Sequence, residues 1–468
     1  MTKAATEHSE VPSLAGQACP ERQSARAMML LLIEKYIFYL FLFAIPFQTR
    51  KILWYSGWRF NEWQSISIYA TDIILIVLLF FWVLNLKKFK LARSDYFLII
   101  FWVVSGISIL NSSDYVLSFF QWIKLLEFSV FYWYLSRYAF ARFGLINSLF
   151  AVMVGGIFQA VVAIIQFVKQ SSLGLRYLGE SVINSDLSGV ASFYTSTGEK
   201  VIRAYGTTPH PNVLATCLFF AMFGFYFIYL YYRLHSKHTP FFDTWDRATL
   251  GFYGVMLFAF FTTFSSVIVF IWFVSFCIRA VVIRAVKHYR ITFGTEVGRK
   301  RIIAMLLVNL AIIILFSSLY FNEIISRSSI SGEDQAVSLR TFYAKEALSM
   351  KWNLLGVGMG NFVGWLMEKE PFLLQYAYQP VHNIYLLIYS ETGILGLTAF
   401  LLFIIFLIKD FISGTRLKKS YDLSMLFFFC SILFIGFFDH FFFTLQQGRL
   451  IFWSGLGLLT YLSNSDII

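Results

Sequence analysis

Long apolar stretches recur along this chain of 468 residues, and they constrain its fold more than any other feature. A spanning helix needs about 20 apolar residues to cross roughly 30 Å of hydrocarbon. A composition of 58% apolar and 14% charged residues excludes a set of soluble domains, and continuous runs without alternation exclude a β-barrel. The sequence therefore predicts an all-α integral membrane protein with about 12 transmembrane helices. The predicted spans are 29–48, 66–86, 95–110, 117–135, 145–168, 211–232, 248–264, 266–285, 302–320, 384–408, 422–438 and 450–463.

The placement of positive charge predicts the orientation of these helices. A net charge of +12 would favour nucleic acid as a partner of a soluble chain, but in membrane proteins Lys and Arg accumulate in short cytoplasmic loops. Lys and Arg are more numerous in the loops after the even-numbered spans than in the opposite segments. Both termini are therefore predicted to be cytoplasmic, with a disordered leader at 1–26 and a polytopic membrane domain at 27–465. The first span is expected to be retained, because it is too long for a signal peptide and lacks a small-residue cleavage site.

Two connecting segments, 169–210 and 321–383, are too long for simple turns and lie on the predicted extracytoplasmic side. Long loops in a compact helical bundle are usually functional or disordered. Both segments contain enough apolar and aromatic residues to fold back on the bundle. Any chemistry is therefore expected to face outward.

The first of these segments ends in IRAYGTTPHPNVLATCL, immediately ahead of the sixth span. Pro211 lies near the start of that helix, where its missing N–H group is harmless. The helix start presents unpaired N–H groups beside Arg203, His210 and Asn212, and this combination favours an anion. An interfacial arginine that binds lipid phosphate without specificity explains the pattern equally well.

The second segment contains SLRTFYAKEALSMKWNLLGVGMGNF. Apolar side chains recur at helical spacing over 338–350, which predicts a helix lying on the bundle with Arg340 near its first turn. Gly356, Gly358 and Gly360 then mark a loop whose backbone comes close to another group. As evidence for a phosphate cradle these glycines are weak, because a tight re-entrant turn explains them as well.

The segment QPVHNIYLLIYSETGILGL carries two ionisable residues, one at the outer mouth of the tenth span and one inside it. His382 and Asn383 stand at its outer mouth, where an imidazole that is neutral near pH 7 can take a proton from a hydroxyl nucleophile. Glu391 lies about two turns deeper, and an ionisable group at membrane depth costs about 2.5 kcal/mol or more unless it is paired or hydrated. We favour a structural role for Glu391, in holding neighbouring helices or capping a bend at Gly393 and Gly396, over direct catalysis.

These segments resemble the signature of the O-antigen ligase and O-antigen polymerase family, which are integral-membrane enzymes with a GT-C-type fold. The resemblance is carried by RAYGTTPHPN ahead of a span, an arginine before LLGVGMGNF, and HNIYLLIYSETGILGL. It implies a large extracytoplasmic loop between spans 9 and 10, a location in the bacterial inner membrane, and a glycan donor linked to undecaprenyl diphosphate. The glycan is then either ligated to an acceptor, such as lipid A-core or another sugar, or joined to further repeats as in a polymerase.

Carried over residue by residue, the resemblance gives His382 the role of activating or positioning the acceptor hydroxyl. Arg340 would grip the donor diphosphate, with Arg203 as a second contact. The supporting residues are Asn383, Glu391, His210, Asn212, Gly356 and Gly358. The chain departs from the family at TTFSSVIVF, where many relatives carry an arginine and Ser266 stands here. Either Arg203 or Arg449 substitutes for that cation, or this branch handles its donor differently.

This chemistry is expected to need no metal or cofactor, because preorganised arginines stabilise the negative charge that builds on a diphosphate leaving group. Asp439 and His440, at the end of the eleventh span, are interpreted as structural rather than metal-binding. The expected partners are the lipid bilayer, the lipid-linked oligosaccharide donor and a glycan or lipid-glycan acceptor, without nucleic acid. Two other classes stay open. A transporter or flippase of lipid-linked glycans would place charged sites near the midplane and show internal repeats, and a membrane scaffold would carry no chemistry.

Overall fold

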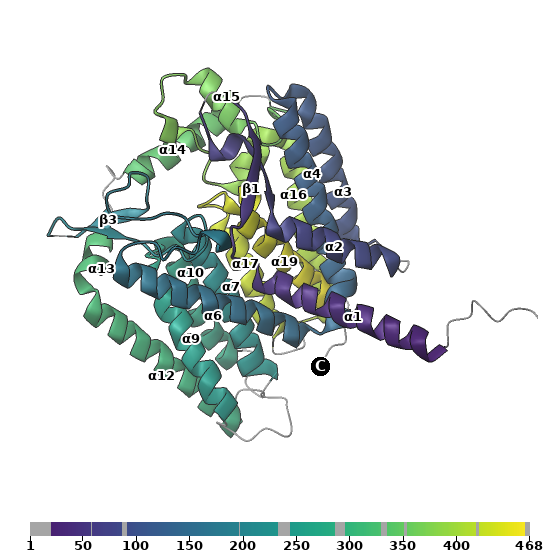
Figure 1. The fold of residues 1–468 in the computed structure, drawn as a ribbon, viewed down its shortest axis with the longest axis vertical. Helices are drawn as coiled ribbons and strands as arrows, with labels where there is room; N and C mark the ends of the chain where they lie inside the picture. Colours follow the sequence, from purple (N-terminus) through teal and green to yellow (C-terminus); the bar gives the residue numbers. More distant parts are fainter. Residues whose placement is uncertain are drawn as a thin grey trace, which may run out of the picture.

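Within the residues that it describes, the computed structural model shows a mostly helical molecule with two short pairs of antiparallel strands (Figure 1). The described residues are 20–57, 59–86, 91–195, 197–232, 244–285, 295–328, 335–350, 353–417 and 421–463. A helix coincides with each predicted span. These helices are α1 (Pro20–Phe43), α2 (Ala70–Leu84), α3 (Arg93–Ser108), α4 (Tyr115–Tyr134), α6 (Leu145–Lys169), α7 (Pro211–Tyr226), α9 (Thr244–Thr262), α10 (Ser266–Ala285), α12 (Glu296–Leu319), α16 (Ile384–Thr415), α17 (Asp422–Ile435) and α19 (Gln446–Ser463).

Shorter elements connect these helices. The short helices are α5 (Phe140–Phe143), α13 (Phe321–Ser328), α14 (Gln335–Ser349), α15 (Phe362–Lys369) and α18 (Phe441–Thr444). The strands are β1 (Arg50–Tyr55) paired with β2 (Ser65–Tyr69), and β3 (Ser192–Tyr194) paired with β4 (Lys200–Ile202).

Five helices in the described part of the chain are long and apolar enough to cross a membrane. They are Arg93–Asn111, Leu145–Lys169, Pro211–Leu230, Glu296–Leu319 and Ile384–Thr415. Helices are suited to lipid because they satisfy their backbone hydrogen bonds internally. The predicted helical class is therefore confirmed, and the apolar helices support a membrane protein. The count of 12 spans and the position of a loop between spans 9 and 10 stay predictions.

The N-terminal part differs from the expected disordered leader at 1–26. Helix α1 begins at Pro20, so the last residues of that leader are helical. Residues 1–19 lie outside the described part of the chain.

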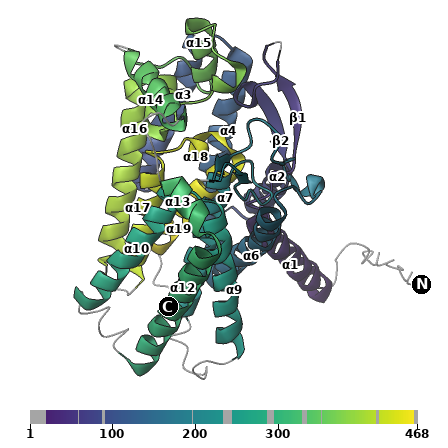
Figure 2. The same ribbon diagram turned by 90° about the vertical axis from the view of Figure 1, so that its left-hand side faces the viewer.

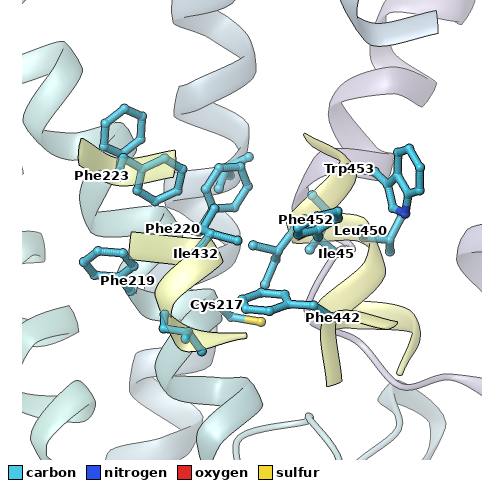
Figure 3. Close-up of a cluster of buried hydrophobic side chains, with 14 of the residues drawn as sticks. Ile45, Cys217, Phe219, Phe220, Phe223, Ile432, Phe442, Leu450, Phe452 and Trp453 are labelled. Carbon is cyan, nitrogen blue, oxygen red and sulfur yellow. The ribbon is translucent and has the colours of Figure 1, made fainter. Parts of the chain in front are cut away.

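The centre of the molecule is built from α7 and α19, which are buried almost all round. Every side chain of α7 except Asn212 is buried, as expected for a helix without a polar face. Aromatic rings fill the contact between α7 and α17, where the rings of Phe223 and Phe428 stack with their centroids 4.0 Å apart. Figure 3 shows Phe219, Phe220 and Phe223 on one side of this cluster, with residues of α17 and α19 nearby.

Two helices of the second long connecting segment and the β1–β2 pair lie at one end of the bundle, whereas β3 and α13 lie lower at its side. Helices α14 and α15 and the β1–β2 pair lie at the upper end in Figures 1 and 2, while α9 and α12 extend to the lower end. The helix predicted over 338–350 is confirmed as α14 (Gln335–Ser349), and its Tyr343 and Ala347 are buried. Helix α16 packs along α3 and carries its N-terminus toward this end.

A kink interrupts α16 at Gly393, whose φ of 70° lies in the left-handed region. The kink frees backbone N–H groups of α16, and the segment before the glycine loop satisfies them. The N–H of Ile394 donates to the carbonyl of Asn353 at 2.9 Å. On the other side of this contact, Gly356 has a φ of 76°, and a Cβ atom there would collide with the backbone of Glu391. The glycines therefore allow two backbones to pack against each other.

We expect Gly356→Ala to lower the stability of the protein by about 3 kcal/mol or more, because it adds a backbone collision to left-handed strain. Gly57→Ala is the matched control, since Gly57 has a φ of 88° but no atom within 4 Å of the place that a Cβ atom would occupy. This control should lose only about 1–2 kcal/mol. Apparent Tm in detergent, followed by size-exclusion chromatography after heating, checks both values. Equal Tm for the two variants would contradict the close-packing explanation.

Candidate functional site

Three histidines and one aspartate from different parts of the chain meet at the end of the bundle that carries α14. His382 directly precedes Asn383 at the start of α16, His210 caps α7, and Asp439 and His440 lie between α17 and α18. The rings of His382 and His440 are 4.8 Å apart between centroids, in an edge-to-face arrangement. The charge of Asp439 acts on all three imidazoles. We call these four residues the histidine cluster.

His382 lies under α14, with its ring stacked on Tyr343 at 5.7 Å between centroids and 11° between planes. The hydroxyl of Tyr343 donates to the carbonyl of Ala377 at 2.6 Å, which holds the tyrosine ring in place. The Nδ1 atom of His382 is buried and has no hydrogen-bond partner among the described residues. An imidazole nitrogen in this state is available to accept a proton from a bound hydroxyl group.

The imidazoles of the histidine cluster are held in the neutral form. Burial lowers the pKa of His382, and the charge of Arg340 lowers it further against the opposing effect of Asp439. Burial also lowers the pKa of His210 and of His440, each to about 3. For Asp439, burial alone would raise the pKa, but the surrounding imidazoles and a hydrogen bond from Asn212 lower it to about 2. The cluster thus combines one carboxylate with three neutral imidazoles at neutral pH.

Arg340 lies on α14 and is partly exposed beside this cluster. Its positive charge acts on His210, His382 and His440. In the part of the chain that the structure describes, its guanidinium makes no hydrogen bond or ion pair. A cation without a protein partner beside neutral imidazoles favours an anionic ligand.

Arg203 is buried and is held by the short link between α9 and α10. Its Nε donates to the carbonyl of Thr263 at 2.6 Å, and its Nη2 donates to Oδ1 of Asn212 at 2.7 Å. Asn212 in turn donates from Nδ2 to Oδ2 of Asp439 at 2.9 Å. Ser265 donates to the same Oδ1 of Asn212 at 3.0 Å. These bonds connect Arg203 to the histidine cluster through Asn212.

The remaining predicted residues have structural contacts. Asn383 caps α16, because its Oδ1 accepts from the N–H groups of Tyr385 and Leu386 at 2.9 and 3.1 Å. The buried carboxylate of Glu391 accepts hydrogen bonds from the backbone N–H groups of Gly360 and Phe362. Glu391 therefore joins α16 to the start of α15.

The glycine loop does not present a row of free N–H groups. The N–H of Gly356 donates to Oδ1 of Asn353 at 2.6 Å, and that of Gly358 donates to the carbonyl of Glu391 at 3.0 Å. These bonds agree with the re-entrant turn, one of the two explanations that the sequence allows for the glycines, and leave the two donors occupied.

A polar cavity of about 60 Å³ lies beside the histidine cluster, between the β1–β2 pair, α4, α19 and the glycine loop. Arg50, Lys124, Glu391 and Arg449 contribute charged groups to its walls. Trp63 connects the two regions, because it lines the cavity and its ring lies 4.8 Å from that of His440, edge to face. We call this space the polar cavity.

Sequence reasoning misses the participation of His440 and the polar cavity. It treats Asp439 and His440 as a separate structural pair, although both stand on the same predicted outer side as His382. Their position on the same predicted side is the sequence feature that could have linked His440 to His382. The walls of the cavity come from segments as far apart as Arg50 and Arg449, and no sequence spacing connects them.

Part of the chain matches a known protein family. Residues 248–401 match a family model described as O-Antigen ligase. No curated protein matches the chain at a significant level. The matched range includes Arg340, His382 and Glu391, whereas Arg203 and His210 precede it. The match covers the helices from α9 to α16, so this part of the chain is similar to the O-antigen ligase family.

Proposed function

We propose that this protein transfers a glycan from an undecaprenyl-diphosphate-linked donor to a hydroxyl group of a glycan or lipid-glycan acceptor. The reaction takes place at the extracytoplasmic face of the bacterial inner membrane and uses no metal. One observation carries the proposal: an imidazole with an unpartnered nitrogen, His382, lies beside a guanidinium without a protein partner in the described residues, Arg340. A base for a hydroxyl and a cation for a diphosphate are what this transfer needs.

In the proposed reaction, the acceptor oxygen attacks the anomeric carbon of the donor sugar. The bond between that carbon and the diphosphate oxygen breaks, and the electron pair leaves with undecaprenyl diphosphate. The hydroxyl proton passes to His382. Arg340 stabilises the negative charge that develops on the leaving oxygen, and a guanidinium does this well because it can bond two phosphate oxygens at once.

Arg203 supplies a second positive charge for the donor in this proposal. Two of its nitrogens are occupied by Thr263 and Asn212, so its main contribution is electrostatic. Its contact with Thr263 places it beside the segment where Ser266 stands in place of the family arginine. Arg449 instead donates to Gln121 at 2.7 Å and to the carbonyl of Phe443 at 2.7 Å in the polar cavity. Arg203 is therefore the better candidate for the missing cation.

Donor binding makes His382 a stronger base. In the free protein, burial and Arg340 hold the pKa of His382 below its ordinary value. A bound diphosphate brings negative charge close to both groups, which offsets Arg340 and favours the protonated imidazole. The proton affinity of His382 thus rises when the substrate is in place.

The lowered pKa of His382 predicts the pH dependence of the reaction. A general base must be unprotonated, so activity falls as pH drops through its pKa, and a lowered pKa moves that fall to more acidic pH. The ordinary pKa of a histidine is 6.5. We expect kcat/KM, which reports the free enzyme, to stay level from about pH 8 down to pH 6.5 and to fall only below that pH. Arg340→Gln should move the fall to higher pH. A wild-type midpoint above 6.5 would contradict the burial of a neutral base.

The direct test uses purified protein and an undecaprenyl-diphosphate oligosaccharide. Release of undecaprenyl diphosphate together with an extended glycan supports the transferase. Movement of the intact lipid across a vesicle bilayer without release would support the rival flippase. Product size then separates the two reactions of the family, because a ladder of repeats means polymerisation and a single addition means ligation.

A further inference from the structure

The polar cavity contains buried polar atoms that the protein itself does not satisfy. Ser67 of β2 and Gln446 of α19 both line it, and their side chains are only 5% and 2% exposed. The Oγ of Ser67 and the Oε1 of Gln446 have no hydrogen-bond partner among the described residues. Buried polar atoms in native proteins are nearly always hydrogen-bonded. Two such atoms on one cavity wall therefore indicate a ligand with hydrogen-bonding groups.

Two of the cations that line the cavity, Arg50 and Lys124, are already neutralised by protein carboxylates. Arg50 forms two parallel bonds to Glu62, of 2.5 and 2.6 Å. Lys124 lies 2.9 Å from Asp72 and 2.7 Å from Glu127. An anionic ligand would have to compete with these carboxylates for the same cations.

The remaining charged groups of the cavity have both signs. The guanidinium of Arg449 donates to Gln121, and the carboxylate of Glu391 accepts from the backbone of the glycine loop. A cationic ligand is disfavoured by Arg449, and an anionic one by Glu391. Hydroxyl groups suit such walls, because each hydroxyl both donates and accepts a hydrogen bond.

The size and the aromatic walls of the cavity fit a sugar. Its volume of about 60 Å³ corresponds to the space of roughly four to six water molecules, which matches part of one sugar ring and not an oligosaccharide. Trp63, Tyr69, Phe120 and Phe443 add aromatic surface to the walls. Small-molecule sites typically combine such apolar surface with a few polar groups that fix orientation.

The cavity also lies next to the proposed base. Pro380 and Thr444 line it, and Thr444 bonds Nδ1 of His440 at 2.7 Å. His440 is the ring that meets His382 edge to face, 4.8 Å away. Because these residues stand between the cavity and His382, a sugar in the cavity would hold the acceptor, and the hydroxyl group that His382 deprotonates would belong to an adjoining part of the same acceptor.

We propose that the polar cavity is the acceptor subsite and binds one uncharged, hydroxyl-rich sugar residue. This inference rests on the proposed glycan transfer, for which it names the acceptor class and its position. Ser67 and Gln446 recognise hydroxyl groups of the acceptor, while the diphosphate of the donor is bound separately by Arg340.

The test measures sugar binding and donor-lipid binding on the same full-length protein in nanodiscs. The sugar probes are the methyl glycosides of glucose, galactose and N-acetylglucosamine, titrated by saturation-transfer NMR. The lipid probe is undecaprenyl diphosphate. Ser67→Ala and Gln446→Leu should each weaken the bound glycoside about fivefold or more, through the loss of one hydrogen bond, and leave undecaprenyl diphosphate affinity unchanged.

Two matched controls separate the cavity from general effects of buried polar atoms. Ser105 and Gln447 also carry a buried oxygen without a partner among the described residues, and neither lines the cavity. Ser105→Ala and Gln447→Leu should leave glycoside affinity unchanged. Gln446 also donates to Thr71 at 3.1 Å and to Asp72, so its variant can lose stability. Ser67→Ala removes only an unpartnered hydroxyl and carries the test in that case.

Several results would overturn the inference. The inference fails if the wild type binds none of the three glycosides. It also fails if Ser67→Ala binds them as tightly as Ser105→Ala does. Tighter binding of glucuronate or glucose 6-phosphate than of the neutral glycosides would overturn the uncharged class. Failure of undecaprenyl diphosphate to bind, with glycoside binding intact, counts against the proposed donor and leaves the sugar subsite standing.

Discussion

His382→Ala abolishes glycan transfer while the protein stays folded and inserted in the membrane. We expect a loss of about 10²-fold or more, the contribution typical of a general base. The reason is geometric. The Nδ1 of His382 has no hydrogen-bond partner among the described residues, so it is the nitrogen left for the acceptor, while the ring also bonds the backbone of Pro380 and stacks on Tyr343. The measurement is the rate of undecaprenyl diphosphate release with a lipid-linked oligosaccharide as donor.

Two companion measurements distinguish a base from a packing residue at this position. His382→Gln keeps most of the volume against Tyr343 but has no basic nitrogen, so it should be as inactive as the alanine variant. Added imidazole should restore part of the activity of His382→Ala, because it supplies the missing base. Normal product in cells that carry only His382→Ala would discard the catalytic role.

Arg340→Lys lowers kcat/KM by about 10²-fold, and Arg340→Ala lowers it further. A lysine keeps the charge but loses the planar fork that bonds two phosphate oxygens, and losing one preorganised donor to a developing oxyanion costs about 10²–10³-fold. The folded protein should tolerate both changes, since this guanidinium makes no hydrogen bond or ion pair with the described residues. Activity and apparent Tm are measured together.

Lys345→Ala is the matched control, because Lys345 is an exposed cation on the same helix. It removes the same unit of charge from α14 and should leave kcat/KM within about twofold of the wild type, as expected for a screened surface charge. A similar loss in Lys345→Ala would reduce the role of Arg340 to a general electrostatic one. If Arg340→Lys has wild-type turnover, the proposed bidentate contact is wrong and only a role for the positive charge is left.

The helical class and the approximate positions of the helices could be predicted from the sequence, because hydropathy and helical periodicity are local properties. The same holds for α14, whose apolar spacing over 338–350 reports which face is buried. The choice of His382 and Arg340 also came from sequence, through short motifs on one side of the predicted bundle.

The tertiary structure decided between explanations that local sequence left open. Gly356 admits either a phosphate cradle or a tight turn, and only its contact with Glu391 selects the turn. The same contact gives Glu391 its structural partner. The contact joins two residues that are distant in the chain, so the sequence around either residue does not show that they meet.

The histidine cluster and the polar cavity show most clearly which features follow from sequence and which follow from packing. Sequence alone determined that this chain forms apolar helices and that an ionisable residue inside one of them, such as Glu391, needs a partner, because an unpaired charge in lipid is costly. The meeting of His210, His382 and His440, and the enclosure of Ser67 with Gln446, were decided by packing. Side chains from separate segments become neighbours only when the helices pack, and the free energy of that packing is spread over the whole core.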